Sequence, residues 1–214
     1  MTIHSLILKS LPMAVVLLAS GTTQAAITVY SSQASYLAAI SSPGVDTFDD
    51  LIIDSAPTPL ARHAGAYTYT AAAGPKSDFY GAGDGADHYL STDNSSDTIT
   101  FSNFGANVRG VGGFFFGSEV RGFYLAGGTM QLTATDTSGT VTQLIINSNT
   151  SSFRGFVSTG ALSTVTLTSA SPATHWVSAN NLTLGVSAVP EPETYGMLLA
   201  GLAGLGFVAR IKRR

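Results

Sequence analysis

Hydrophobic and polar residues alternate along most of the chain between residues 45 and 184, a period of two that is typical of half-buried β-strands. Two alternating runs flank the turn residues 136–139 and predict a hairpin. The run from Arg109 to Phe116 is largely apolar and predicts a central strand covered on both faces. The predicted strands are residues 45–48, 66–70, 97–101, 109–116, 129–135, 140–146, 153–157, 163–168 and 176–184.

One segment before these strands has a helical period. Ala34, Leu37 and Ala38 share one face of a helix over residues 32–40. Ser31 or Ser32 can cap its N-terminus, and Pro43-Gly44 ends it. The pattern therefore predicts an all-β, antiparallel, jelly-roll-like sandwich that carries one short N-terminal helix.

The first 25 residues have the layout of a secretory signal peptide. A weakly basic start with Lys9 precedes an apolar core at residues 11–19 and a small-residue exit, with cleavage expected after Ala25 or Ala26. The alternative, an N-terminal membrane anchor, is less favoured because the apolar core is too short to span a bilayer. We therefore expect an exported domain over residues 26–188.

The last 26 residues form a second terminal signal, residues 189–214. Pro190, Glu191 and Pro192 predict an extended, exposed segment. An uncharged run from Tyr195 to Ala209 predicts a transmembrane helix, although it is shorter than the ~20 residues of an untilted span. The basic residues that follow mark the cytoplasmic end of this segment, and they are Arg210, Lys212, Arg213 and Arg214.

This order of Pro-Glu-Pro, Gly-rich apolar run and basic cluster resembles the PEP-CTERM sorting signal of Gram-negative bacteria. The resemblance implies that the tail holds the exported protein in the inner membrane until an exosortase, a membrane-embedded cysteine transpeptidase, cuts near Pro190-Glu191-Pro192. The protein then reaches the cell surface or the extracellular polysaccharide matrix of a biofilm. An ordinary single-span tail anchor would explain the apolar and basic parts, but not the paired prolines.

The domain before the tail resembles, more loosely, ectodomains that often precede PEP-CTERM signals. The shared features are a short helix at residues 35–40, an acidic strand end at residues 47–51, a Phe-x-Gly-Phe segment that starts at Phe153, and a last strand that contains Asn180-Asn181-Leu182. The resemblance implies a jelly-roll of the type used by carbohydrate-binding modules. Asn180 stands where those domains usually have aspartate, which weakens a metal site built on this strand.

Composition narrows the classes of function. The chain has no Cys, which excludes thiol nucleophiles and thiolate metal sites. Residues 26–188 carry 11 acidic and 5 basic side chains, a net charge of −6, so nucleic-acid binding is disfavoured.

Two groups of oxygen ligands are candidate calcium sites, because Ca²⁺ binds carboxylate and carbonyl oxygens. The first is Asp78, Asp84 and Asp87 in a Gly-rich segment that we expect to be a loop. The second is Asp49, Asp50 and Asn181. The alternative for the first group is a solvated acidic loop whose Asp side chains cap their own turns.

Aromatic residues offer candidate platforms on which sugar rings can stack. They are Tyr67, Tyr69, Tyr80, Tyr89 and Trp176. The alternative is burial, because Tyr67 and Tyr69 share one face of a strand and Trp176 has the parity of Leu182 and Leu184.

Catalytic motifs are absent from the sequence. His63, His88 and His175 are isolated, and neither a Gly-x-Ser-x-Gly elbow nor a His-Glu-x-x-His helix occurs. Two hypotheses follow. The favoured one is a non-enzymatic exported protein of the envelope or matrix that binds polysaccharide, and the alternative is an exported hydrolase of matrix polysaccharide.

Overall fold

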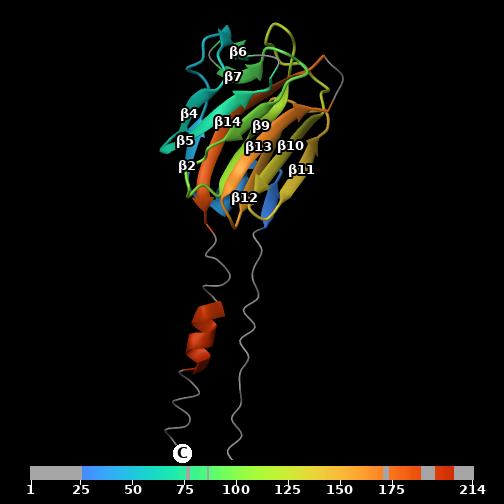
Figure 1. Ribbon diagram of the computed structural model, residues 1–214. Coiled ribbons are helices and arrows are strands. Elements are labelled where there is room, and N and C mark those ends of the chain that lie inside the picture. Colours follow the sequence, from blue (N-terminus) through green and yellow to red (C-terminus); the bar gives the residue numbers. More distant parts are fainter. Residues whose placement is uncertain (1–25, 76–77, 86, 171–173, 189–195, 205–214) are drawn as a thin grey trace, which may run out of the picture.

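The protein is a sandwich of two antiparallel β-sheets (Figure 1). The computed structural model describes residues 26–75, 78–85, 87–170, 174–188 and 196–204. The expected signal peptide and most of the expected sorting signal lie outside these ranges. The predicted all-β antiparallel sandwich is confirmed.

The larger sheet has eight strands and the smaller has six. In spatial order the larger sheet is β1 (Ile27–Tyr30), β12 (Phe153–Ser158), β9 (Gly110–Ser118), β14 (Trp176–Ser187), β7 (Asp87–Thr92), β6 (Phe79–Asp84) and β3 (Ser55–Ala56), with β2 (Ile40–Asp46) also paired to β14. The smaller sheet is β11 (Thr140–Ile145), β10 (Met130–Asp136), β13 (Leu162–Ser169), β8 (Ile99–Ser102), β5 (Tyr67–Ala73) and β4 (Leu60–Ala64).

Several predicted elements are found where the alternation placed them. The hairpin of β10 and β11 is confirmed, and Met130, Leu132 and Ala134 all point into the core. Strand β9 lies between β12 and β14 and is covered on both faces, as its apolar run predicts. Strands β1, β3, β4, β6 and β7 were not predicted, because each is short or lacks a clear apolar alternation.

The main core lies between the two sheets. Inward-facing side chains from both sheets fill it, including Phe79, Phe101, Phe115, Leu132 and Phe156, all with no exposed surface. This interdigitation of alternate residues from two facing sheets is the expected source of stability for a domain without disulfides.

Helix α1 (Gln33–Ala39) is present, and the face shared by Ala34, Leu37 and Ala38 is its exposed face. Ser32 caps the helix by accepting a hydrogen bond from the Ser35 amide at 3.2 Å. Tyr36 and Ala39 are buried, whereas Ala34, Leu37 and Ala38 are exposed. The reason is the surface beneath the helix, where the Tyr36 ring lies on Gly112 and Gly155. A Cβ atom at Gly155 would lie only 2.5 Å from this ring, and one at Gly112 would lie 3.1 Å from it.

A β-bulge divides the long strand β14 in two. Its register with β9 shifts between Asn180 and Thr183, and Asn181 adopts a left-handed φ of 49°. Before the bulge β14 also pairs with β7, and after it with β2. The extra residue inverts the alternation, so Val177 and Ala179 point into the core together with Leu182 and Leu184.

The bulge corrects the parity assigned to Trp176. Because Val177 and Ala179 point inward, Trp176 points to the outer face of the larger sheet. Two elements pack on this outer face. Helix α1 packs on the half formed by β12 and β9, and the segment of residues 119–125 packs over Tyr89 and Phe116 on the other half.

Both ends of the folded domain lie at one end of the sandwich, which we call the exit end (Figure 1). The Ala26 amide donates a hydrogen bond to Thr159 Oγ1 at 3.0 Å, and the Ala188 amide donates one to the Ala39 carbonyl at 3.0 Å. The opposite end, which we call the distal end, carries the β6–β7 pair and the start of β14.

Residues 196–204 are helical and belong to the expected membrane segment from Tyr195 to Ala209. No helix within the described ranges has the length and hydropathy that a membrane span requires.

Replacement of Asn181 tests the role of the bulge. We expect Asn181→Val to lower the free energy of unfolding by about 1–2 kcal/mol, because a β-branched residue is strained at a left-handed φ. Asn181→Gly should remain within about 0.5 kcal/mol of the wild type. Urea unfolding of the purified protein measures both values, and equal stability of the two variants would contradict the assignment.

Candidate functional sites

A cluster of charges, which we call the Arg62 clamp, joins the two sheets at one edge of the sandwich. It consists of Asp46 at the end of β2, Asp50 in the following loop, and Arg62 in β4. Phe48 adopts a left-handed φ of 63°, and its amide donates a hydrogen bond to Asp46 at 3.1 Å. This tight turn directs the chain back, so that Asp50 also reaches Arg62.

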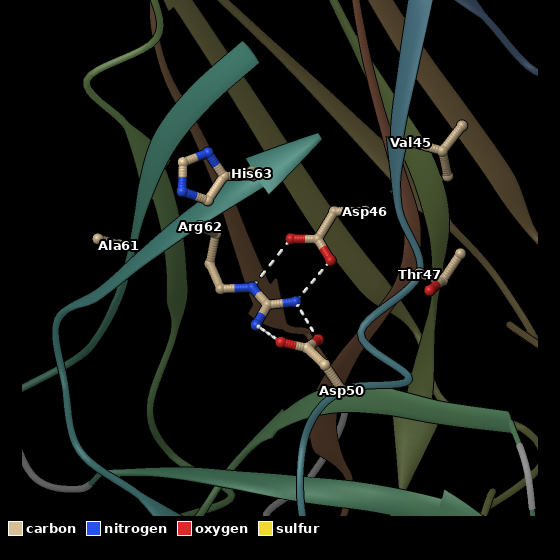
Figure 2. Close-up of a pocket in the computed structure, with 7 residues that line it drawn as sticks. All are labelled: Val45, Asp46, Thr47, Asp50, Ala61, Arg62 and His63. Atoms are coloured by element: carbon tan, nitrogen blue, oxygen red, sulfur yellow. Dashed lines mark hydrogen bonds and ion pairs between the residues drawn. The ribbon is translucent and has the colours of Figure 1, made fainter. Parts of the chain in front are cut away.

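The guanidinium of Arg62 binds both carboxylates in a bidentate manner (Figure 2). Its Nε and Nη2 donate to Asp46 at 2.9 and 2.6 Å, and its Nη1 and Nη2 donate to Asp50 at 2.8 and 2.7 Å. The Arg62 Cζ atom also lies 5.2 Å from the centre of the Phe48 ring. Such paired contacts are the strongest that arginine makes with carboxylates.

The electrostatics of the clamp follow from burial and pairing. The side chains of Arg62 and Asp46 are 10% and 4% exposed, whereas that of Asp50 is 70% exposed. Burial lowers the pKa of Arg62, but hydrogen bonds to Asp50 and Asp46 more than offset this effect and raise it. Hydrogen bonding from Arg62 holds the pKa of Asp50 below its ordinary value. Burial, and then the charge of Asp46, raise the pKa of the Tyr69 hydroxyl, which donates to Asp46 at 2.6 Å.

The contacts around the pocket at the clamp indicate that these residues stabilise the sandwich and do not form a catalytic site. It is lined by Val45, Asp46, Thr47, Asp50, Ala61, Arg62 and His63 (Figure 2). Both carboxylates are bound by the one guanidinium, and Asp46 is also occupied by Tyr69. Sequence reasoning missed Asp46 and Arg62, because no local pattern connects a strand arginine to a carboxylate 16 positions before it.

Removal of the guanidinium tests this structural role. We expect Arg62→Met to lower the free energy of unfolding by about 3–5 kcal/mol, because it leaves the buried Asp46 carboxylate without a counter-charge. The matched control is Arg121→Met, whose side chain is 76% exposed in its ion pair with Glu119 and should cost at most about 1 kcal/mol. Chemical denaturation of both variants gives the comparison, and equal small losses would show that the clamp contributes little.

The first candidate calcium group is not brought together. The segment expected to be a loop is the β6–β7 hairpin, in which Asp84 pairs with Asp87 at one end. Asp78 precedes the other end of β6, about 20 Å away along a six-residue strand. Asp78 accepts a hydrogen bond from the Thr58 amide at 3.4 Å, and Asp87 accepts one from Asn180 at 2.9 Å.

The residues of the second candidate calcium group have separate roles in the fold. Asp49 accepts a hydrogen bond from the His88 amide at 3.1 Å, Asp50 belongs to the Arg62 clamp, and Asn181 is the left-handed residue of the bulge. In the part of the chain that the structure describes, no three His, Cys, Asp or Glu side chains are grouped so that they could hold a metal ion.

The predicted sugar-stacking residues divide into buried and accessible ones. Tyr69 and Tyr89 are 2% and 5% exposed and belong to hydrophobic clusters, so neither can present its ring to a ligand. Tyr67 packs against the main core and donates to the Ser42 carbonyl at 2.8 Å. Tyr80 and Trp176 are half-buried on the outer face of the larger sheet.

Two further aromatic residues, missed in the sequence, lie near Trp176 and Tyr80. Phe123 and Tyr124 belong to the segment 119–125 and are 46% and 39% exposed. Ser118 pairs with Trp176 on one side and forms a bridge with Tyr124 on the other, so these two rings flank one strand on the same face. Tyr80 approaches the same segment at Gly122. We call Tyr80, Phe123, Tyr124 and Trp176 the distal aromatic patch.

The histidines do not form a catalytic arrangement. His88 lies with Nδ1 2.7 Å from the Leu51 carbonyl and Nε2 3.1 Å from the Gly85 carbonyl. His175 lies 3.1 Å from Thr174 Oγ1 and 3.3 Å from the Ala126 carbonyl. His63 is exposed at the pocket of the Arg62 clamp. The described residues therefore suggest no nucleophile with its general base.

The comparisons with known proteins identify the C-terminal segment. The PEP-CTERM protein-sorting motif matches residues 188–214, so the predicted resemblance is confirmed. The chain is thus a β-sandwich protein with a signal that marks exported proteins for handling by an exosortase at the cell envelope. The sorting residues Pro190, Glu191, Pro192, Arg210, Lys212, Arg213 and Arg214 lie outside the described ranges.

The other comparisons are less extensive. No curated protein matches the chain. A solved structure titled TmCBM61 in complex with beta-1,4-galactotriose is similar with 14% sequence identity and a TM-score of 0.29, and the match covers 56% of this chain and 88% of that one.

Proposed function

We propose that this protein is an exported component of the cell surface or extracellular matrix whose folded domain acts there after its tail has been removed. In this proposal a signal peptide of residues 1–25 directs export, residues 26–188 fold outside the inner membrane, and residues 189–214 are the sorting signal. The observation that carries the proposal is the sorting motif at residues 188–214, which begins where the last strand of the sandwich ends.

The chemistry of the tail supports a membrane-held intermediate. The uncharged run from Tyr195 to Ala209 would lie in the inner membrane, and Arg210, Lys212, Arg213 and Arg214 would stay on the cytoplasmic side. An exosortase would then cut near Pro190-Glu191-Pro192 and release the domain from this anchor.

Replacement of both prolines of the motif tests processing. In a bacterium with an exosortase we expect the wild-type surface product to lack residues 211–214, and a Pro190→Ala, Pro192→Ala variant to remain full-length in the membrane. The matched control is Pro75→Ala, an exposed proline in the sandwich, which should be processed normally. Mass spectrometry of the C-terminus measures the outcome, and a wild-type surface product that retains Ile211 to Arg214 would refute the proposal.

For the domain itself we propose polysaccharide binding without catalysis. The distal aromatic patch supports this, because Trp176 and Tyr124 lie two strand positions apart on one face at the end opposite to the exit. That separation is about 10 Å, which suits stacking on every second sugar unit of an extended polysaccharide. Arg121 lies 5.7 Å from the Phe123 ring and adds donors for hydroxyl groups at the edge of the patch.

A double substitution tests the aromatic patch. We expect Trp176→Ala with Tyr124→Ala to weaken retention on neutral matrix polysaccharide about tenfold, since two stacking contacts contribute about 1–3 kcal/mol. Leu144→Ala is the control, because Leu144 is equally apolar and 49% exposed on the smaller sheet. Affinity electrophoresis with the purified mature protein measures retention. Release of sugar products in the same gels would instead support the alternative, an exported hydrolase.

A further inference from the structure

The last residue of the sandwich that the structure describes, Ala188, is hydrogen-bonded to α1. Ser187 pairs with Ile40, and the Ala188 amide then donates to the carbonyl of Ala39, the last residue of the helix, at 3.0 Å. The C-terminal segment therefore leaves the fold at the C-terminal end of α1.

Very little chain separates this point from the sorting motif. Pro190 and Pro192 follow Ala188 by two and four residues. Since an extended chain spans at most about 3.6 Å per residue, the prolines lie within about 7 and 14 Å of Ala188. An enzyme that holds residues 190–192 in its active site must therefore approach α1 closely while Ala188 stays bound.

The exposed face of α1 is apolar and firmly held. Ala34, Leu37 and Ala38 face outward, and Leu37 is 38% exposed. Beneath them the Tyr36 hydroxyl donates to the Thr183 carbonyl of β14 at 2.8 Å, and the Tyr36 ring packs against Phe153. The helix cannot turn this face inward without losing these contacts.

The chain segment that contains this face carries no charge. Residues 26–45, which contain β1, α1 and most of β2, include no Asp, Glu, Lys, Arg or His. An uncharged apolar surface loses little hydration free energy when a protein at the membrane surface covers it, whereas charged side chains would have to be desolvated.

We infer that the exposed face of α1, formed by Ala34, Leu37 and Ala38, is a docking surface for the membrane-embedded enzyme that cuts at residues 190–192. This inference rests on the proposed processing of the tail. The enzyme contacts α1 because the motif follows the fold so closely, and the helix thereby places the scissile segment relative to the active site. Recognition of the substrate then involves the folded domain as well as the Pro-Glu-Pro motif.

A charge on this face tests the inference. We expect Leu37→Glu, and independently Ala38→Glu, to slow removal of the tail at least fivefold in a pulse-chase experiment with the full chain in exosortase-containing cells. Leu144→Glu is the control, because it places the same charge on an exposed leucine of the smaller sheet and should leave the rate unchanged.

A longer connection should remove the dependence on α1. Two chains that both carry ten Gly and Ser residues between Ala188 and Val189 are compared. We expect the one with Leu37→Glu to be processed as fast as the one that keeps Leu37. Processing of Leu37→Glu and Ala38→Glu at the wild-type rate would overturn the inference. A defect that persists after the insertion would also overturn it, because the substitution would then act through folding or export.

Two further measurements separate the competing outcomes. If the purified tail-free domain floats with phosphatidylethanolamine–phosphatidylglycerol vesicles and Leu37→Glu abolishes this, the lipid surface is the occupant and the inference fails. If the Pro190→Ala, Pro192→Ala chain is still cleaved in the pulse-chase, the proposed processing itself fails. If cleavage requires the two prolines but proceeds at the wild-type rate in the α1 variants, only the inference about α1 is overturned.

Discussion

The register of β14 is the constraint on which the rest of the structure depends. This strand pairs with β9 along both of its halves, with β7 before the bulge and with β2 after it. Without the extra residue at Asn180–Thr183, the apolar side chains of either the first or the second half of β14 would point away from the core. The bulge therefore lets one strand supply core residues over its whole length while its outer neighbour changes. It also sets Trp176 on the outer face and brings the end of β14 beside α1.

The Arg62 clamp lies where β14 changes its neighbour, because Asp46 pairs with Leu182 directly after the bulge. Four carboxylates lie around the point where β14 stops pairing with β7 and starts pairing with β2. They belong to Asp46, Asp49, Asp50 and Asp87. The domain has a net charge of −6, so these carboxylates repel one another unless they are paired. Arg62 comes from the smaller sheet and binds the carboxylates of Asp46 and Asp50, so it links the two sheets at this point.

The sequence predicted those parts of the fold that local patterns determine. The β10–β11 hairpin, the covered strand β9 and the Ser32 cap all follow from short-range alternation or capping. The features that the sequence did not predict correctly, or did not predict at all, depend on residues that are distant in sequence. The buried face of α1 depends on Gly112 and Gly155, and the orientation of Trp176 depends on one bulge residue. The clamp joins Arg62 to two carboxylates that precede it by 12 and by 16 positions. Of the candidate sites, only the sorting motif is contiguous in sequence, and it was recognised for that reason.

The two ends of the sandwich differ in chemistry, which fits the proposal that the protein is first held at a membrane and later released. The exit end gathers both chain termini and the uncharged residues 26–45. The distal end carries the aromatic side chains that remain accessible, among them Phe123 and Tyr124. Because the strands run between these ends, a ligand bound at the distal end would not obstruct processing at the exit end. In the proposed function, cleavage at the exit end and ligand binding at the distal end would therefore not interfere with each other.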